Sequence, residues 1–191
     1  MSDFKIVDGV YIGPEVFKGD LNLEGSSVTD LGGLREVHGF LDLRSTGVND
    51  LGGLREVHGA LWLAGSCVTG LGNLREVGDN LYLSGSCVTD LGSLSKVGGD
   101  LYSGGTGVTS LGDLREVGGW LDLRGTGVYD LGDLRKVGGF VYAGSEEYCE
   151  LPKLQDLVKE IEVSSVSDLV ERLPVEKDPF LKRVIERRIR E

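Results

Sequence analysis

Residues 81–100 have the sequence L-Y-L-S-G-S-C-V-T-D-L-G-S-L-S-K-V-G-G-D, one of six consecutive blocks of equal length between Leu21 and Phe140. The blocks follow one another without insertion or deletion, with the consensus L-x-L-x-G-[ST]-x-V-T-D-L-G-x-L-R-E-V-G-G-x. Within the block, positions 1, 8, 11, 14 and 17 are Leu, Val, Leu, Leu and Val in every copy, and position 12 is always Gly. A fixed 20-residue period of this kind predicts a solenoid whose stacked coils share one core.

The pattern inside one block predicts a short strand and a tight turn. Apolar residues at positions 1 and 3 alternate with outward positions 20, 2 and 4, which is typical of a strand in a parallel sheet. Asp at position 10 is expected to cap a short helical or 3₁₀ turn through L-G-x-L-R-E-V. The Gly-Gly pair at positions 18 and 19 permits positive φ angles on entry to the next strand. The 31 glycines of this 191-residue chain therefore indicate a rigid coil rather than a flexible linker.

The phase of the repeat also predicts three regions. Residues 1–20 form an N-terminal cap and partial repeat, with a strand or hairpin in residues 1–13. Residues 21–163 form the solenoid, because the core slots continue into a seventh block at Val141, Ala143, Tyr148, Leu151, Leu154 and Leu157, and into an eighth strand at 161–163. Residues 164–191 form an α-helical C-terminal cap, with an amphipathic helix after Asp178-Pro179 that seals the stack or, alternatively, binds a partner.

The segment Val88 to Thr106, close to V-T-D-L-G-x-L-R-E-V-G-G-x-L-x-L-x-G-T, resembles a shortened leucine-rich repeat of the bacterial-internalin type. It is also similar to the L domains of growth-factor receptors. The resemblance covers about residues 14–163 and implies a leucine-rich-repeat-like parallel sheet with short helical turns. Two departures stand out: the internalin type has a longer repeat of about 22 residues, and hydroxyls replace its asparagine ladder at Ser26, Thr46, Ser66, Ser86, Thr106 and Thr126. A flatter rod that approaches a parallel β-helix is the alternative fold.

Composition excludes several classes of function. With 20 basic and 31 acidic residues the formal net charge is -11, which makes nucleic-acid binding unlikely. No apolar run is long enough to span a membrane, and no secretory signal is visible. Three cysteines are too few for a disulfide scaffold, so we expect a cytoplasmic protein. We also expect a monomer or a weak homo-oligomer.

Catalytic, cofactor and metal sites are not expected. His38 and His58 share position 18 of adjacent blocks, but no third metal ligand is evident from the sequence. Cys67 and Cys87 share position 7, and reduced neighbours are favoured over a disulfide or a metal site. The Asp residues at position 10 lack the glycine–aspartate nonapeptide of calcium-binding repeats. No phosphate-binding loop, dinucleotide fingerprint or nucleophile elbow is present either, so we expect no enzyme.

The outward face of the predicted strands is the best candidate for a binding site. Its positions 20, 2 and 4 vary between blocks although the core does not. The candidate binding residues are the aromatic side chains and flanking charges Phe40, Arg44, Trp62, Tyr82, Tyr102, Trp120, Arg124, Phe140 and Tyr142. Small residues at position 4, such as Ala64, leave space beside these rings. Aromatic residues with Arg at the margins are typical interface anchors, although aromatic residues also favour strands for cross-strand packing.

Three functions fit this face. The first is a non-enzymatic scaffold that binds another protein of unknown identity. The second is a carbohydrate-binding or adhesin-type rod in which the aromatic rings stack on sugars. The third is an acidic inhibitor protein, which is less favoured because acidic and basic residues alternate along the blocks instead of clustering.

Overall fold

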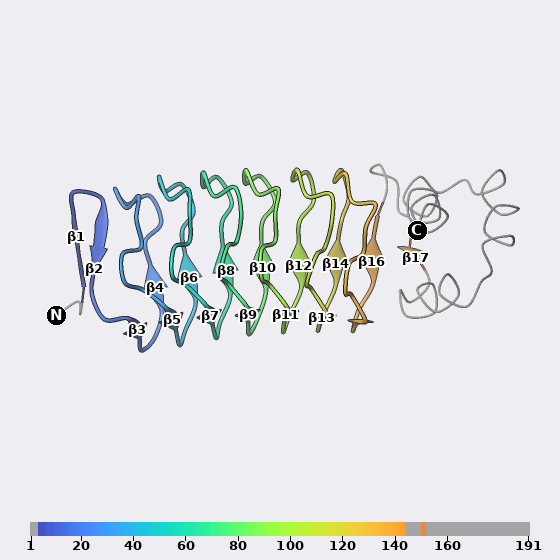
Figure 1. Ribbon diagram of the computed structural model, residues 1–191, viewed down its shortest axis with the longest axis horizontal. Coiled ribbons are helices and arrows are strands. Elements are labelled where there is room, and N and C mark those ends of the chain that lie inside the picture. Colours follow the sequence, from blue (N-terminus) through green and yellow to red (C-terminus); the bar gives the residue numbers. More distant parts are fainter. Residues whose placement is uncertain (1–3, 144–149, 152–191) are drawn as a thin grey trace, which may run out of the picture.

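The computed structural model describes residues 4–143 and 150–151, and there the chain winds into a solenoid of stacked coils. Figure 1 shows the coils side by side along one axis, with one turn of chain for each block of the sequence. Two parallel sheets run along the stack, and a separate two-stranded hairpin covers its N-terminal end. The repeat therefore defines a β-solenoid.

The first sheet is built from positions 1 and 2 of each block, and equivalent residues pair in register, as Leu81 pairs with Leu101. Its parallel strands are β4 (Leu21–Asn22), β6 (Leu41–Asp42), β8 (Leu61–Trp62), β10 (Leu81–Tyr82), β12 (Leu101–Tyr102), β14 (Leu121–Asp122) and β16 (Val141–Tyr142). Strand β17 (Glu150–Leu151) adds to β16 in the antiparallel direction.

The second sheet is built from positions 16 and 17, also in register. Its strands are β3 (Val16–Phe17), β5 (Glu36–Val37), β7 (Glu56–Val57), β9 (Glu76–Val77), β11 (Lys96–Val97), β13 (Glu116–Val117) and β15 (Lys136–Val137). The prediction of a helical turn in this segment is wrong, because no residue of the described ranges is helical. Each coil gains more hydrogen bonds by pairing this segment with the neighbouring coil than a single isolated helical turn could make.

The core confirms the predicted inward positions. Side chains at positions 1, 8, 11, 14 and 17 are almost completely buried from coil to coil, for example Leu81, Val88, Leu91, Leu94 and Val97, each no more than 2% exposed. One continuous apolar cluster extends along the stack. Such burial contributes about 25 cal/mol per Å² of apolar area and is available only when coils stack.

Aspartates at position 10 cap the turn that follows them, although the turn is not helical. The Oδ1 atoms of Asp30, Asp50, Asp90 and Asp130 accept hydrogen bonds from the backbone N–H two residues later, at 2.6–3.0 Å. The residue that donates this hydrogen bond is the invariant glycine of position 12, whose φ is between +53° and +59°. An L-residue pays roughly 1–2 kcal/mol in this left-handed region, which explains why position 12 is always Gly.

The Gly-Gly pair at positions 18 and 19 has a different purpose from the one predicted. These glycines do not have positive φ within the six blocks. At Gly39, Gly99 and Gly119, an added Cβ would collide with the Oδ1 atom of Asp20, Asn80 and Asp100 in the preceding coil. Those oxygens accept the backbone N–H of Phe40, Asp100 and Trp120 at 2.7–3.0 Å. The missing side chain therefore leaves room for a coil-to-coil hydrogen bond.

At position 10 the coils meet in pairs. Isolated bridges join Val10 to Asp30, Gly70 to Asp90, and Ser110 to Asp130. Gly92 follows the bridged pair 70/90, and a Cβ on it would lie 2.7 Å from the backbone nitrogen of Gly72 and closer still to its carbonyl oxygen. Gly112, which has the same φ, has nothing within 4 Å of such a Cβ. Consecutive coils are thus closer at some turns than at others.

Position 6 carries a row of hydroxyls that bond within their own coils rather than between coils. Thr46 and Thr106 donate to the carbonyl oxygens of Leu43 and Ser103, both at 2.7 Å. The hydroxyl of Ser66 is buried and has no hydrogen-bond partner among the described residues. This row therefore forms separate turn-closing hydrogen bonds rather than a continuous ladder along the stack.

A hairpin lies at the N-terminal end of the stack, where the sequence predicts a strand or hairpin in residues 1–13. Strands β1 (Lys5–Val7) and β2 (Val10–Ile12) form an antiparallel hairpin around Asp8-Gly9, both with positive φ. Tyr11 is buried against the first coil, and its backbone N–H donates to Asp30 at 2.9 Å. This hydrogen bond attaches the hairpin to the turn of the first block, while β3 and β4 remain the terminal strands of the two long sheets.

The C-terminal prediction is only partly tested. Leu151, expected in the turn of a seventh coil, instead pairs with Val141 across an antiparallel ladder. It follows Val141 by ten residues, too few for the 20-residue circuit that a parallel neighbour requires. The predicted eighth strand at 161–163 and the helical cap 164–191 lie outside the described residues. Within residues 4–143 and 150–151, no helix is long and apolar enough to cross a membrane.

Candidate functional site

The outer face of the first sheet carries a ladder of aromatic rings on β8, β10 and β12. The rings of Trp62 and Tyr82 stack with centroids 5.7 Å apart and 12° between their planes. Those of Tyr82 and Tyr102 stack at 5.0 Å and 5°. Phe40 packs edge-on against Trp62 at 5.2 Å. In-register pairing of parallel strands produces this ladder, because it places position 2 of each coil directly beside position 2 of the next.

An Asp–Arg pair lies at the N-terminal end of the ladder. The Asp42 carboxylate is only 3% exposed, and it accepts a backbone N–H and three guanidinium contacts from Arg44 at 2.5–3.1 Å. The hydrogen bond to Asp42 raises the pKa of the Arg44 guanidinium above its usual value. Arg44 also reaches Glu24 at 3.1 Å and lies 5.8 Å from the ring centroid of Trp62.

The same Asp–Arg arrangement recurs four coils later. Asp122 accepts the Arg124 backbone N–H at 3.0 Å and its guanidinium at 2.6–2.9 Å. Arg124 lies 5.3 Å from the ring centroid of Tyr142. Because Asp122 occupies position 2 between Tyr102 and Tyr142, it divides the aromatic residues into two groups. Each arginine therefore forms an ion pair with an adjacent carboxylate, and its flat guanidinium group lies beside an aromatic ring.

The tyrosine hydroxyls of the ladder are held by polar residues at position 20. Tyr102 donates its hydroxyl to Asp100 Oδ2 at 2.8 Å, and Asn80 Nδ2 donates to the hydroxyl of Tyr82 at 3.0 Å. The hydrogen bond to Asp100, followed by partial burial, raises the pKa of Tyr102 to about 12. These two rings are therefore fixed in place at both the ring face and the hydroxyl.

The second aromatic group is more exposed. Trp120 and Phe140 are 45% and 50% exposed, whereas Trp62, Tyr82 and Tyr102 are half-buried. The Trp120 ring lies 6.4 Å from Phe140 and 6.0 Å from Tyr142, both at steep angles. The structure thus places every predicted binding residue on one sheet face but divides them into a tightly stacked ladder and a looser, exposed cluster. We call Trp120, Arg124, Phe140 and Tyr142 the exposed cluster.

Position 4 beside the ladder carries small residues, of which Ala64 and Gly104 are half-buried and Ser84 is exposed. Within the ladder, both faces of Tyr82 are covered by the neighbouring rings of Trp62 and Tyr102.

A second cluster lies on the other sheet, where the sequence places His38 and His58 at equivalent positions but gives no evident third metal ligand. His38 and His58 stack with ring centroids 4.8 Å apart and 20° between their planes, and neither has the left-handed backbone that position 18 was thought to tolerate. Glu36 Oε1 lies 2.9 Å from Nε2 of both histidines. Glu56 is the next acidic neighbour, with Oε2 3.8 Å from His58 Nε2. We call Glu36, His38 and His58 the histidine cluster.

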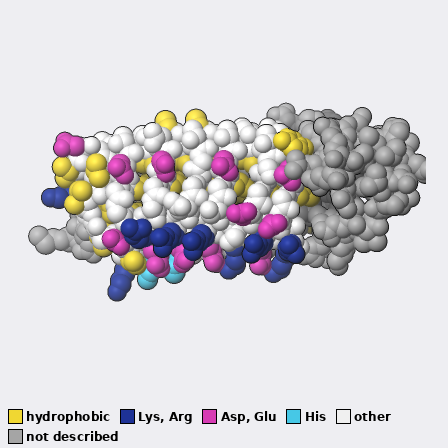
Figure 2. All heavy atoms as spheres, in the orientation of Figure 1, with side chains coloured by type: hydrophobic (Ala, Val, Ile, Leu, Met, Phe, Trp, Pro, Cys, Tyr) yellow, Lys and Arg dark blue, Asp and Glu magenta, His cyan; other side chains and the backbone are white. Residues whose placement is uncertain are grey.

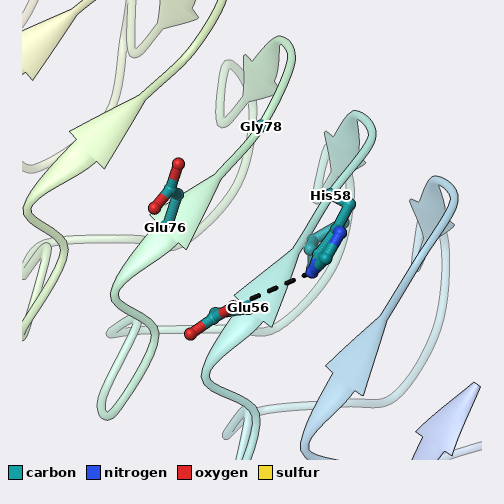
Figure 3. A pocket seen from close by; sticks show the side chains of 5 residues that line it. Glu56, His58, Glu76 and Gly78 are labelled. Atoms are coloured by element: carbon teal, nitrogen blue, oxygen red, sulfur yellow. Dashed lines mark ion pairs between the residues drawn. The ribbon is translucent and has the colours of Figure 1, made fainter.

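A cavity of about 270 Å³ adjoins this cluster and is lined by Glu56, Val57, His58, Glu76 and Gly78. Figure 3 shows Glu56 and Glu76 on neighbouring strands, with His58 at the side of the cavity and the backbone of Gly78 opposite. Glu76 forms an ion pair with Lys96, with 2.5 Å between Oε1 and Nζ. Since Gly78 holds the position that the histidines occupy in the two preceding coils, the absent side chain leaves this space open.

The proximity of Glu36 to the histidines was present in the sequence as the spacing Glu36-Val37-His38. Residues two apart on a strand point to the same side, so Glu and His at positions 16 and 18 share the outer face. The signal was hidden because the segment was assigned to a helical turn. Cys67 and Cys87 are free and exposed, as expected for reduced neighbours, and Cys149 lies outside the described residues.

The chain matches no protein-family model, no curated protein and no solved structure. The class of protein is therefore defined by its own architecture. It is a parallel β-solenoid repeat protein with a 20-residue coil, two sheets and one aromatic outer face. The finer assignment to leucine-rich repeats rests on the motif alone.

Proposed function

We propose that this protein is a non-enzymatic scaffold that binds another protein through the outer face of the sheet β4–β16. The observation that carries the proposal is the exposed cluster. Trp, Tyr and Arg are the residue types that contribute most to binding energy at protein interfaces, and they do so in compact groups. Trp120, Phe140, Tyr142 and Arg124 form such a group on a rigid sheet.

The stacked ladder supports the same function as a preorganised surface. Its rings are fixed by stacking and by the hydroxyl contacts of Tyr82 and Tyr102, so a partner would not need to order them on binding. Side chains that are immobile before association avoid an entropic cost of about 0.5–1.5 kcal/mol each. The exposed cluster would anchor the partner, and the ladder would extend the contact along the rod.

The alternatives predicted from the sequence fit the geometry less well. Stacking on sugars needs a free ring face, which Tyr82 lacks because Trp62 and Tyr102 cover both of its faces. A sugar would therefore be limited to the end of the ladder or to the exposed cluster. An acidic inhibitor needs a field of one sign, yet Figure 2 shows acidic and basic side chains mixed along the edge that holds the histidines. On the second sheet, Lys96 and Lys136 form ion pairs with Glu76 and Glu116.

The test uses a photo-reactive phenylalanine analogue at Phe140 and, as a control, at Tyr129, an exposed aromatic residue at position 9 outside this face. The protein cross-linked from position 140 in a lysate of the native host is purified, and its Kd is measured with both variants Trp120→Ala and Phe140→Ala. We expect at least one to lose roughly 2 kcal/mol, about 30-fold in Kd. Equal cross-linking from position 129, or an unchanged Kd for both variants, would contradict the proposal.

A further inference from the structure

We propose that Glu36, His38 and His58 form a binding site for a divalent cation of the zinc class. The site lies on the second sheet, away from the proposed protein-binding face, and does not depend on it. Two imidazole nitrogens and one carboxylate oxygen are a donor set that Zn²⁺ and neighbouring transition metals bind in proteins. Hard cations such as Mg²⁺ and Ca²⁺ prefer all-oxygen sites, which disfavours them here.

The distances support a shared ligand position. The candidate ligand atoms of the three side chains all lie within 4.8 Å of one another. Both Nε2 atoms lie 2.9 Å from the same Oε1 of Glu36, so the two imidazoles and the carboxylate converge on one point. In a zinc site with ligand bonds of about 2.0–2.2 Å, neighbouring ligand atoms are only slightly farther apart than the 2.9 Å between Glu36 Oε1 and each Nε2.

The side chains also have the freedom that metal binding requires. Those of His38 and His58 are 42% and 48% exposed, so modest rotation of the rings can open the space between the nitrogens. Glu36 is only 30% exposed, which limits its movement and makes it the fixed member of the site. The two strands that carry these residues, β5 and β7, are held in parallel register, so the backbone supplies a rigid base.

The surroundings leave coordination positions open. The cluster supplies three protein ligands, and the cavity of about 270 Å³ beside His58 has room for water. Glu56 lines that cavity 3.8 Å from His58 Nε2 and can complete the set directly or through a water molecule. An arrangement of three protein ligands with an open position is typical of exchangeable or reactive zinc rather than of a closed structural site.

The repeat itself provides matched variants. Position 18 is Gly in the other four blocks, so His38→Gly and His58→Gly introduce a residue that the coil already uses. Glu36→Gln removes the charge at constant size. Glu116→Gln is the control, because Glu116 occupies the same position 16 but is paired with Lys136. The chain has only two histidines, so every imidazole NMR signal of tag-free protein belongs to this cluster.

The experiment titrates Zn²⁺ into ¹⁵N-labelled, tag-free protein and follows the imidazole nitrogens, with Kd measured by chelator competition. A Cys67→Ser/Cys87→Ser background run in parallel separates zinc held by the thiols. We expect both imidazoles to shift together at one equivalent of zinc. Glu36→Gln should weaken binding at least about tenfold, since even outer-shell partners have effects of this size. The double histidine variant should abolish the site, and Glu116→Gln should leave it unchanged.

Two results would overturn the proposal. Imidazole signals that do not respond to stoichiometric zinc would show that Glu36 is simply a hydrogen-bond acceptor between two histidines. A Glu36→Gln variant with the Kd of the wild type would show that the carboxylate is no ligand. Circular dichroism of each variant, compared with the wild type, confirms that the coils remain folded.

Discussion

Three Gly→Ala substitutions separate the two physical reasons for glycine in this solenoid. Gly70 lies at position 10 without positive φ, and its added Cβ would make an ordinary contact of 3.6 Å with Asp90. Gly112 has φ +53° and open space around the Cβ. Gly92 has φ +55°, but its Cβ would lie 2.7 Å from the backbone nitrogen of Gly72. The three sites therefore differ by one factor at a time.

The magnitudes follow from these environments. Alanine restricts the unfolded chain and so stabilises Gly70→Ala by up to about 0.4–1 kcal/mol. In Gly112→Ala the left-handed backbone costs roughly 1–2 kcal/mol, which leaves a net loss of about 1 kcal/mol after the same unfolded-state gain. Gly92→Ala carries that loss and must also push two backbones apart, an overpacking cost of about 1–3 kcal/mol. We expect its total loss to be about 2–4 kcal/mol.

Urea unfolding at 25 °C, followed by far-UV circular dichroism, gives the free energy of unfolding for each variant. The expected order of stability is Gly70→Ala, Gly112→Ala, Gly92→Ala, from highest to lowest. Equal losses in Gly92→Ala and Gly112→Ala would refute the argument that coils are closer at one turn than at the other. A loss in Gly70→Ala as large as in Gly112→Ala would refute the role of the left-handed φ.

Two further substitutions test single polar groups. Removing the hydroxyl in Thr46→Ala should cost about 1 kcal/mol in unfolding free energy, because its bond to the backbone is lost. Ser66→Ala should cost less, since that buried hydroxyl has no hydrogen-bond partner in the part of the chain that the structure describes. Equal costs in urea unfolding would contradict this difference. The hydroxyl of Tyr102 should ionise near pH 12 in a spectrophotometric titration, and Asp100→Asn should lower that pKa toward 10. Because the folded-state pKa is raised, the associated stability is complete below about pH 10 and is lost as the pH rises from 10 to 12.

The core was predictable because it depends on residue type at a fixed period. The positions of Leu81 and Val88 are apolar in every copy, so stacking of the coils buries each as a continuous row. The same reasoning placed the aromatic residues of position 2 on one face. It did not reveal that Trp62 and Tyr82 would stack face to face, because ring orientation depends on side-chain rotamers that the period does not encode.

The second sheet was missed for a related reason. Glu36–Val37 is a strand of two residues, too short to show alternation, and its neighbours Leu34 and Arg35 fit a helical turn equally well. Strand formation there depends on the adjacent coil, which a local pattern does not describe. The histidine cluster was missed for the same reason, because Glu36 faces His38 only when the segment is extended.

The in-register pairing of equivalent positions limits how specifically one coil can recognise its neighbour. Leu pairs with Leu and Val with Val at nearly every boundary, so the core and the backbone ladder accept any coil as the neighbour of any other. Two molecules that open at the same boundary would therefore exchange halves without losing these contacts. Only coil-specific groups, such as the bridge from Arg44 to Glu24 or the stacked rings of His38 and His58, distinguish one junction from the next. The variable residues thus determine which coils pair with one another, because the repeated residues do not distinguish between them.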